Sequence, residues 1–74
     1  PSDMPTFEKN AGIWIAQLMN ECALSTSSSE ALRLIKQGGV KINGERLTDT
    51  KLNLEAGEYV IQAGKRKFAR ILIK

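Results

Sequence analysis

The sequence predicts an α+β fold in which two packed helices precede a small twisted sheet. Apolar residues recur with the helical period of about 3.6 before Gly38 and with the strand period of 2 after Gly39. Two turns that contain glycine, Asn43-Gly44 and Gly64-Lys65-Arg66, then divide the second part into short, mostly antiparallel strands. Helices followed by strands are typical of the α+β class, and 74 residues suffice for one small domain.

The first ten residues, 1–10, are expected to form a linker or tail. Both prolines of the chain lie in this segment, which has few apolar residues and no clear periodicity. The folded domain is therefore expected to span residues 11–74.

The first helix is predicted over residues 13–24. Its apolar residues are spaced i, i+3, i+4 and i+7, the pattern of a helix with one buried stripe; they are Ile15, Leu18, Met19 and Cys22. Cys22 is the only cysteine, and we expect it to be a core residue because no basic residue lies near it in sequence. Trp14, at the margin of the stripe, is expected to pack in the core; stacking on a nucleic-acid base and docking onto the parent protein are the alternatives.

The second helix is predicted over residues 28–37. Ser27 and Glu30 match a capping box, which satisfies two backbone N–H groups at a helix start. Gly38-Gly39 should end the helix, because glycine readily adopts the left-handed conformation found there. At 100° per residue the apolar and polar sides separate cleanly. Ala31, Leu32, Leu34 and Ile35 form the apolar side, and Arg33, Lys36 and Gln37 form the polar side.

The rest of the chain is predicted to be extended. Val40 and Ile42 alternate with polar residues, and Asn43-Gly44 is typical of a type I′ hairpin turn, which requires positive φ at both central residues. Further extended segments are expected at residues 45–47, 52–54, 59–63 and 67–73, of which the last two form a hairpin.

The composition excludes several kinds of site. The chain has no His and one Cys, so zinc sites built from several such residues, and catalytic groups that pair Ser or Cys with His, cannot form within it. No apolar run approaches the roughly 20 residues that span a bilayer, and no secretory signal is visible. We therefore expect a soluble intracellular protein whose chain carries no metal site, no catalytic residue and no membrane contact.

Charge is distributed unevenly along the chain. Residues 1–30 have a net charge of −3 and residues 31–74 a net charge of +6. A basic surface is typical of domains that bind polyanions. The basic residues also have explanations that involve no ligand: those on the helix could form an ordinary solvated face, and those near a strand edge could protect it against aggregation. The candidate basic residues are Arg33, Lys36, Lys41, Lys65, Arg66, Lys67 and Arg70.

The segment Ser27–Gly44, SSSEALRLIKQGGVKING, resembles the S4 domain, an RNA-binding module. The hallmark of that family is a serine-capped helix of the form S-x-x-E-A-x-x-x-I-x-Q-G-G-V followed by a V-x-x-N-G turn, and the match is nearly complete. The downstream segment Ala56–Ile73, AGEYVIQAGKRKFARILI, more particularly resembles the C-terminal S4-like domain of bacterial tyrosyl-tRNA synthetases. The resemblance covers residues 11–74 and implies an S4-like fold.

This resemblance also implies a function. In that family the enzyme is a cytoplasmic homodimer, joined through its class I catalytic domain, that uses ATP to attach tyrosine to tRNA(Tyr), and the C-terminal module grips the tRNA body. Many S4 domains have a basic residue where this chain has Leu32, which weakens the helix contact. By resemblance the RNA contacts are Arg33, Lys36, Gln37, Lys41, Lys65, Arg66, Lys67 and Arg70, while Asn43 and Gly44 hold the turn.

The catalytic motifs of class I synthetases, HIGH and KMSKS, have no counterpart in the sequence. We therefore expect the chain to be a piece of a longer protein, with residues 1–10 leading from its catalytic domain. A stand-alone S4 protein and an S4 accessory domain of an RNA-modifying enzyme, such as a pseudouridine synthase, are alternatives. A protein-docking module that uses the Trp14 side of the first helix is the alternative without RNA.

Overall fold

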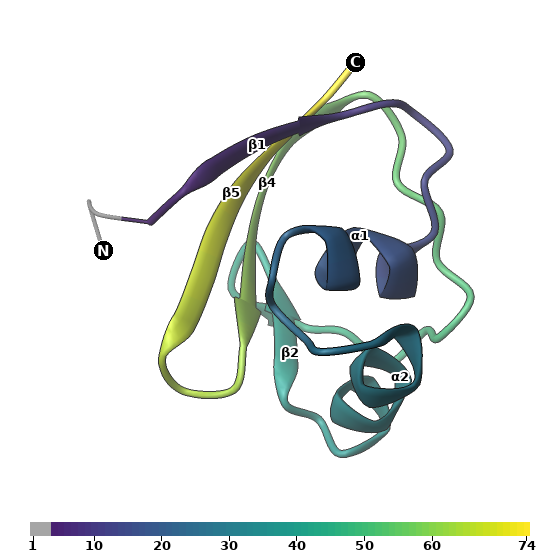
Figure 1. The fold of residues 1–74 in the computed structure, drawn as a ribbon, viewed down its shortest axis with the longest axis vertical. Coiled ribbons are helices and arrows are strands. Elements are labelled where there is room, and N and C mark those ends of the chain that lie inside the picture. Colours follow the sequence, from purple (N-terminus) through teal and green to yellow (C-terminus); the bar gives the residue numbers. More distant parts are fainter. Residues whose placement is uncertain (1–3) are drawn as a thin grey trace.

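The computed structural model describes residues 4–74 and has two helices beside a five-stranded mixed sheet (Figure 1). The strand order is β1-β5-β4-β2-β3, in which β1 and β5 are parallel and the other neighbours are antiparallel. The predicted α+β class, with a mostly antiparallel sheet, is confirmed. The elements are β1 (Thr6–Lys9), α1 (Ile15–Glu21), α2 (Ser28–Lys36), β2 (Val40–Ile42), β3 (Glu45–Arg46), β4 (Gly57–Ala63) and β5 (Lys67–Ile73).

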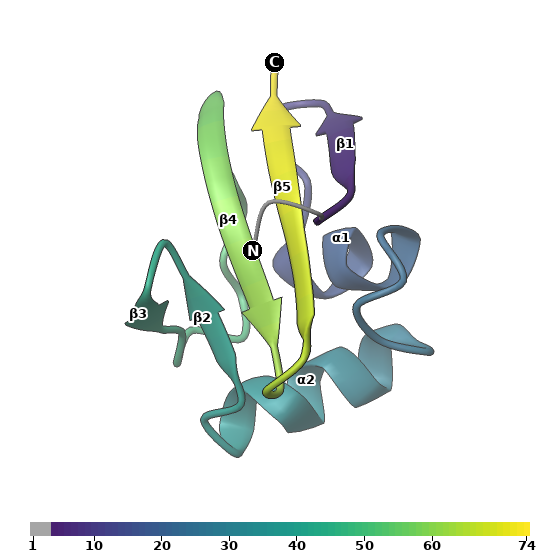
Figure 2. The ribbon, with the colours of Figure 1, turned by 90° about the vertical axis from the view of Figure 1, so that its left-hand side faces the viewer.

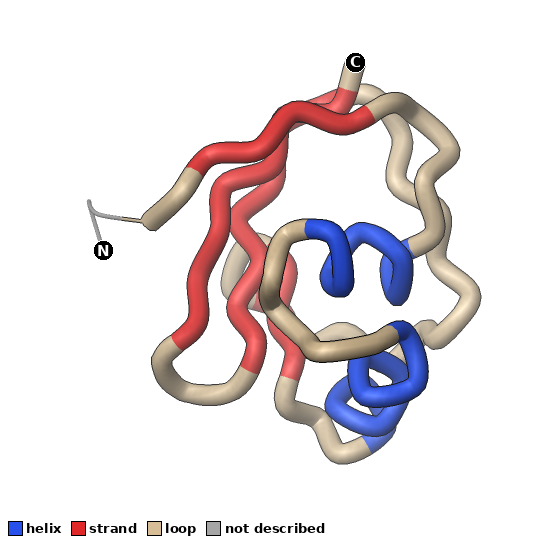
Figure 3. Tube along the Cα trace, viewed as in Figure 1, coloured by secondary structure: helices blue, strands red, loops and turns tan. Residues whose placement is uncertain are grey.

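The two helices lie on one side of the sheet, as the colouring by secondary structure shows (Figure 3). A view turned by 90° looks onto the other side of the sheet, where no helix of residues 4–74 lies (Figure 2). In this view the turn between β4 and β5 lies at the same end of the molecule as α2, whereas the far end of β5 lies at the opposite end. The last hairpin therefore has its turn at the α2 end of the domain and the end of β5 at the other.

Both predicted helices are present, and each is shorter than its sequence pattern indicates. α1 begins after Trp14, whose extended backbone bridges Asn53, and it ends before Ala23, which has a positive φ of 60°. At the start of α2 the backbone N–H of Glu30 donates to Oγ of Ser27 at 3.1 Å, as predicted. The carboxylate of Glu30 accepts from the Thr26 hydroxyl, so this contact takes the place of the second bond of a capping box.

The predicted hairpin turn at Asn43-Gly44 is confirmed, with φ of 53° and 85°. Asn43 also joins the turn to β4, because its backbone N–H donates to the Val60 carbonyl and its Oδ1 accepts from the Val60 N–H, both at 2.8 Å. The final hairpin forms as predicted, with β4 beginning at Gly57, two residues earlier than expected. Residues 52–54 pair with the loop before α1 and not with the sheet.

The expectation of a linker over residues 1–10 is wrong for Thr6–Lys9, which form β1. The backbone N–H of Arg70 donates to the Pro5 carbonyl at 2.8 Å, and Phe7 packs against the core. The pattern was missed because a four-residue edge strand with one half-buried aromatic residue has too few apolar positions to show a period. Its partner β5 lies at the other end of the chain. Residues 1–3 of the expected linker lie outside the described residues.

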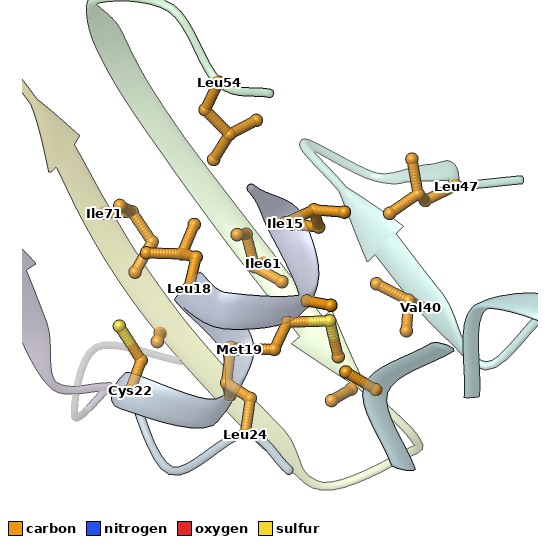
Figure 4. Close-up of a cluster of buried hydrophobic side chains, with 14 of the residues drawn as sticks. Ile15, Leu18, Met19, Cys22, Leu24, Val40, Leu47, Leu54, Ile61 and Ile71 are labelled. Carbon is orange, nitrogen blue, oxygen red and sulfur yellow. The ribbon is translucent and has the colours of Figure 1, made fainter. Parts of the chain in front are cut away.

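A single core fills the space between the helices and the sheet (Figure 4). Met19 of α1, Ile35 of α2 and Ile61 of β4 are fully buried in it. Cys22 is buried as predicted, and burial raises the pKa of its thiol, so the group remains a protonated packing residue at neutral pH. Trp14 packs at the edge of the core, where its indole Nε1–H donates to the Thr50 carbonyl at 2.9 Å.

Within residues 4–74, no helix has the length and apolar character needed to cross a membrane.

Candidate nucleic-acid interface

The outward side of α2 carries three of the predicted contacts, Arg33, Lys36 and Gln37, and all three are exposed. α2 buries Ala31 and Ile35, which turns Arg33 directly away from the core at 100° per residue. Arg33 and Gln37 follow Glu30 by about one and two turns and border the same flank of the helix. Lys36 lies farther round, toward the opposite flank.

The β4–β5 turn brings Lys65, Arg66 and Lys67 beside α2. The backbone N–H of Gly64 donates to the Gly39 carbonyl at 2.6 Å, which fastens the turn to the segment that follows the helix. Together with Glu30 and Leu34 of α2, the turn lines a cavity of about 360 Å³. Lys65–Lys67 thus lie across one depression from Glu30 and Leu34, which are more than 30 residues away in sequence, whereas Arg33, Lys36 and Gln37 of α2 do not line it.

Lys41 has a basic neighbour that the sequence analysis did not include, Arg46. The two residues are directly paired across β2 and β3, so their side chains lie next to each other on one face of the sheet. The Arg46 side chain extends over the end of α2: a Cβ added at Gly38 would lie 3.3 Å from its Cδ and 3.5 Å from a guanidinium nitrogen. The two-residue loop at Asn43-Gly44 fixes this register, so the sequence contained the signal that places Arg46 opposite Lys41.

Arg70 lies apart from the other predicted contacts on the hairpin. Side chains alternate along β5, so Arg70 lies on the face opposite to that of Lys67. It pairs with Thr6 in the strand register, and its Nε lies 3.7 Å from a carboxylate oxygen of Glu58. The structure therefore places Arg70 on the open face of the sheet and not at the turn beside α2.

This surface offers positive charge and not acid–base chemistry. Elsewhere on the molecule, Lys9 donates a hydrogen bond to Glu21 in a 2.7 Å ion pair, which raises the pKa of the lysine and lowers the pKa of the glutamate. No cluster of three potential metal ligands occurs among residues 4–74. Exposed cations on rigid elements suit the binding of phosphate groups.

Comparison with known proteins identifies the family of this chain. The family model described as "Tyrosine--tRNA ligase SYY-like C-terminal domain" matches residues 1–71. The chain is 54% identical to tyrosine–tRNA ligase 2 of Vibrio cholerae and 51% identical to that of Vibrio parahaemolyticus, each over 74 residues. It is 45% identical to the tyrosine–tRNA ligase of Campylobacter jejuni over the same length.

All of the chain is covered in these three matches, but only 18–19% of each relative, so the chain spans about a fifth of the length of the curated relatives that it matches. Each match begins at the first residues of the chain, including the segment that forms β1. With a family model over residues 1–71 and relatives at about half identity over its full length, the chain belongs to the family of SYY-like C-terminal domains of tyrosine–tRNA ligases.

Proposed function

We propose that this domain binds the body of tRNA(Tyr) and positions it for a cytoplasmic tyrosine–tRNA ligase. The observation that carries the proposal is the bond between Gly64 and Gly39, which holds the cations of the β4–β5 turn beside the exposed polar side of α2. The printed names of the relatives, tyrosine–tRNA ligases, support tRNA as the polyanion.

The proposed mechanism is electrostatic and geometric. Lys and Arg side chains on α2, β2, β3 and the turn contact phosphates of folded RNA, and they read shape more than base sequence, because the major groove of A-form RNA is too narrow for side chains. The domain performs no reaction itself. It orients the tRNA for a class I catalytic domain that uses ATP and dimerises with its copy, so the binding energy lowers the entropic cost of the reaction.

The proposed contacts are Arg33, Lys36, Gln37, Lys41, Lys65, Arg66 and Lys67, and we add Arg46 because it is paired with Lys41 across β2 and β3. Arg70, on the other face of the hairpin, is a contact only for RNA that also reaches the open face of the sheet.

The test reverses charge on α2 and on the β4–β5 turn with Arg33→Glu and Arg66→Glu. We expect tRNA(Tyr) transcript to bind the double variant at least about tenfold more weakly at about 0.1 M salt, measured by fluorescence anisotropy. The slope of log K against log salt should become shallower by about 0.7 to 0.9 for each phosphate contact that is lost. Circular dichroism checks that the variant is folded.

A matched control changes the net charge by the same amount elsewhere, with Lys51→Glu and Lys74→Glu. Lys74 lies at the end of β5 remote from α2 (Figure 2), and Lys51 lies in the loop before β4. The control should retain most of the affinity. If both double variants lost the same affinity for tRNA(Tyr), binding would depend on net charge alone, which would contradict a defined binding surface.

Docking to a partner protein through Trp14 is less well supported. The indole N–H is already bonded to the Thr50 carbonyl, and the ring packs against the domain's own core. The stand-alone S4 protein and the RNA-modifying enzyme are also not favoured, because the relatives compared above are tyrosine–tRNA ligases.

A further inference from the structure

The cavity between α2 and the β4–β5 turn has a construction that phosphate binding alone does not require. Three of its lining residues are apolar, Leu24, Leu34 and Ala63, and we call them its floor; Leu24 and Ala63 are buried. The three consecutive cations of the turn, Lys65–Lys67, also line it, and we call them its rim. A surface that contacted only the RNA backbone would gain nothing from an apolar floor, because phosphate and ribose are polar.

One further side chain gives the cavity a polar edge. Glu30 lines the cavity, and its carboxylate is held by the Thr26 hydroxyl while its backbone N–H is held by Ser27. A fixed carboxylate accepts hydrogen bonds and donates none at neutral pH. The cavity therefore combines apolar contact, a hydrogen-bond acceptor and adjacent positive charge in about 360 Å³, which lies within the range of small-ligand sites.

We infer that this cavity receives one unstacked nucleobase of the bound RNA. This rests on the proposed function, because it names what part of the RNA enters the depression between α2 and the cations of the β4–β5 turn. The base lies against the apolar floor, its amino group donates to Glu30, and the phosphates on either side of it contact the turn. Bases with an exocyclic amino group are therefore preferred over uracil, which has none.

Charge favours a nucleotide over an amino-acid side chain as the occupant. Three cations and one carboxylate leave the lining with an excess of two positive charges. A base brings its own phosphates to such a rim, whereas an aromatic side chain of a partner protein brings no negative charge. Single-stranded and bulged positions of RNA are where bases are free to leave the stack and enter protein pockets.

The test uses the 74-residue chain, whose core is formed from its own residues, and RNA hairpins that share one stem. The hairpins carry a single bulged cytidine, a single bulged uridine or an abasic nucleotide at the same position. We expect the cytidine hairpin to bind about tenfold more tightly than the abasic hairpin and about fivefold more tightly than the uridine hairpin.

Two variants connect the preference to the cavity. Leu34→Gln makes the floor polar and should abolish the tenfold advantage of a base over the abasic site without weakening the abasic hairpin. Leu32→Gln is the matched control, because Leu32 is also half-buried on α2 but lies on the opposite flank, and it should keep the advantage. Glu30→Gln leaves the backbone cap in place and should remove the preference for cytidine over uridine. This variant tests the pocket even if a leucine variant fails to fold.

The outcomes separate this inference from the proposed function. Hairpins that all bind tightly, with a steep salt dependence and no difference between a base and the abasic site, would overturn the base pocket and leave the phosphate surface intact. Failure of every hairpin and of tRNA(Tyr) to bind would overturn both. Loss of the preference in Leu32→Gln as much as in Leu34→Gln would also overturn the pocket.

Discussion

Asn43 connects three parts of the fold through a single residue. Its φ of 53° makes the hairpin turn, and its backbone and side chain hold both the carbonyl and the N–H of Val60 in β4. Few residue types provide both a left-handed backbone and a short side-chain acceptor. The register that places Lys41 beside Arg46 therefore depends on this asparagine.

Replacing Asn43 separates its two roles. Asn43→Gly keeps the left-handed backbone but loses the side-chain bond and should reduce the free energy of unfolding by about 1 kcal/mol. Asn43→Ala loses the bond and adds backbone strain, for a reduction of about 2 kcal/mol. Asn43→Asp keeps an acceptor and should lie close to the unchanged protein. Urea unfolding followed by circular dichroism measures all three, and equal losses for Gly and Asp would contradict the role of Oδ1.

The ion pair between Lys9 and Glu21 gives a prediction for pH. Hydrogen bonds from Lys9 and Gln17 hold the pKa of Glu21 below its usual 4.5, so its contribution to stability is present above that value and is lost as the pH falls through the lower folded-state pKa. The bond to Glu21 raises the pKa of Lys9 above 10.5, so its contribution is present below that value and is lost as the pH rises through the higher folded-state pKa.

Glu21→Gln should therefore lower the midpoint of urea unfolding at pH 7 and make no difference at a pH well below 4.5, where both proteins are uncharged at this position. Glu55→Gln, which removes an exposed carboxylate in the loop before β4, is the matched control. An unfolding difference for Glu21→Gln that persisted unchanged into acid would mean that the pair contributes nothing through its charge.

At the scale of the element, α2 is defined by its two ends. Ser27 caps the first turn, and the helix is followed by Gly38 with a φ of 75°, after which the N–H of Gly39 donates to the Leu34 carbonyl at 2.9 Å. Both ends were predicted because caps are local in sequence. The length and direction of α2 determine where Arg33 and Glu30 lie relative to the β4–β5 turn.

Removing the cap should loosen the first turn of α2. Ser27→Ala loses the acceptor for the Glu30 N–H and should cost about 1 kcal/mol of unfolding free energy, whereas Ser27→Asp, which also caps helices, should restore most of it. Ser29→Ala, an exposed change within the same turn, is the control and should be neutral or slightly stabilising. Hydrogen exchange at Glu30 should accelerate in Ser27→Ala alone.

At the scale of the whole molecule, the sheet joins the two ends of the chain. β1 lies along β5 in parallel, so the last strand has neighbours on both sides and the open edges are the short strands β1 and β3. This arrangement reduces the length of unpaired strand that could aggregate.

Deleting residues 1–9 tests whether β1 belongs to the domain. We expect a loss of at least about 2 kcal/mol in unfolding free energy, from the packing of Phe7 and from hydrogen bonds such as that of the Lys74 N–H to the Lys9 carbonyl. Phe7→Ala in the full chain separates the side chain from the strand. If the shortened chain unfolded at the same urea concentration as the full chain, β1 would contribute nothing to stability and this segment would be a linker.

The sequence predicted the elements whose interacting residues are close together along the chain and missed an element whose partner is far away. The helices, the Asn43-Gly44 turn and the final hairpin depend on neighbours within a few positions, and they were found. β1 was missed because its partner is more than 60 residues away. The basic residues could be identified but not fully arranged, because nothing local indicates that Gly64 bonds to Gly39. Alternation along the predicted strand 67–73 did indicate that Arg70 and Lys67 lie on opposite faces, but the sequence analysis did not use that signal.

The approach of Arg46 to Gly38 has a consequence for how this domain can evolve. A side chain at position 38 would strain the backbone, whose φ is 75°, and its Cβ would lie 3.3 Å from Cδ of the arginine, which would have to move by a few tenths of an ångström. Replacement of the glycine should therefore be tolerated better in homologues that have a shorter residue at position 46. Selection for a long cationic side chain at position 46 would thus also favour glycine at position 38, even if that glycine contacts no nucleic acid.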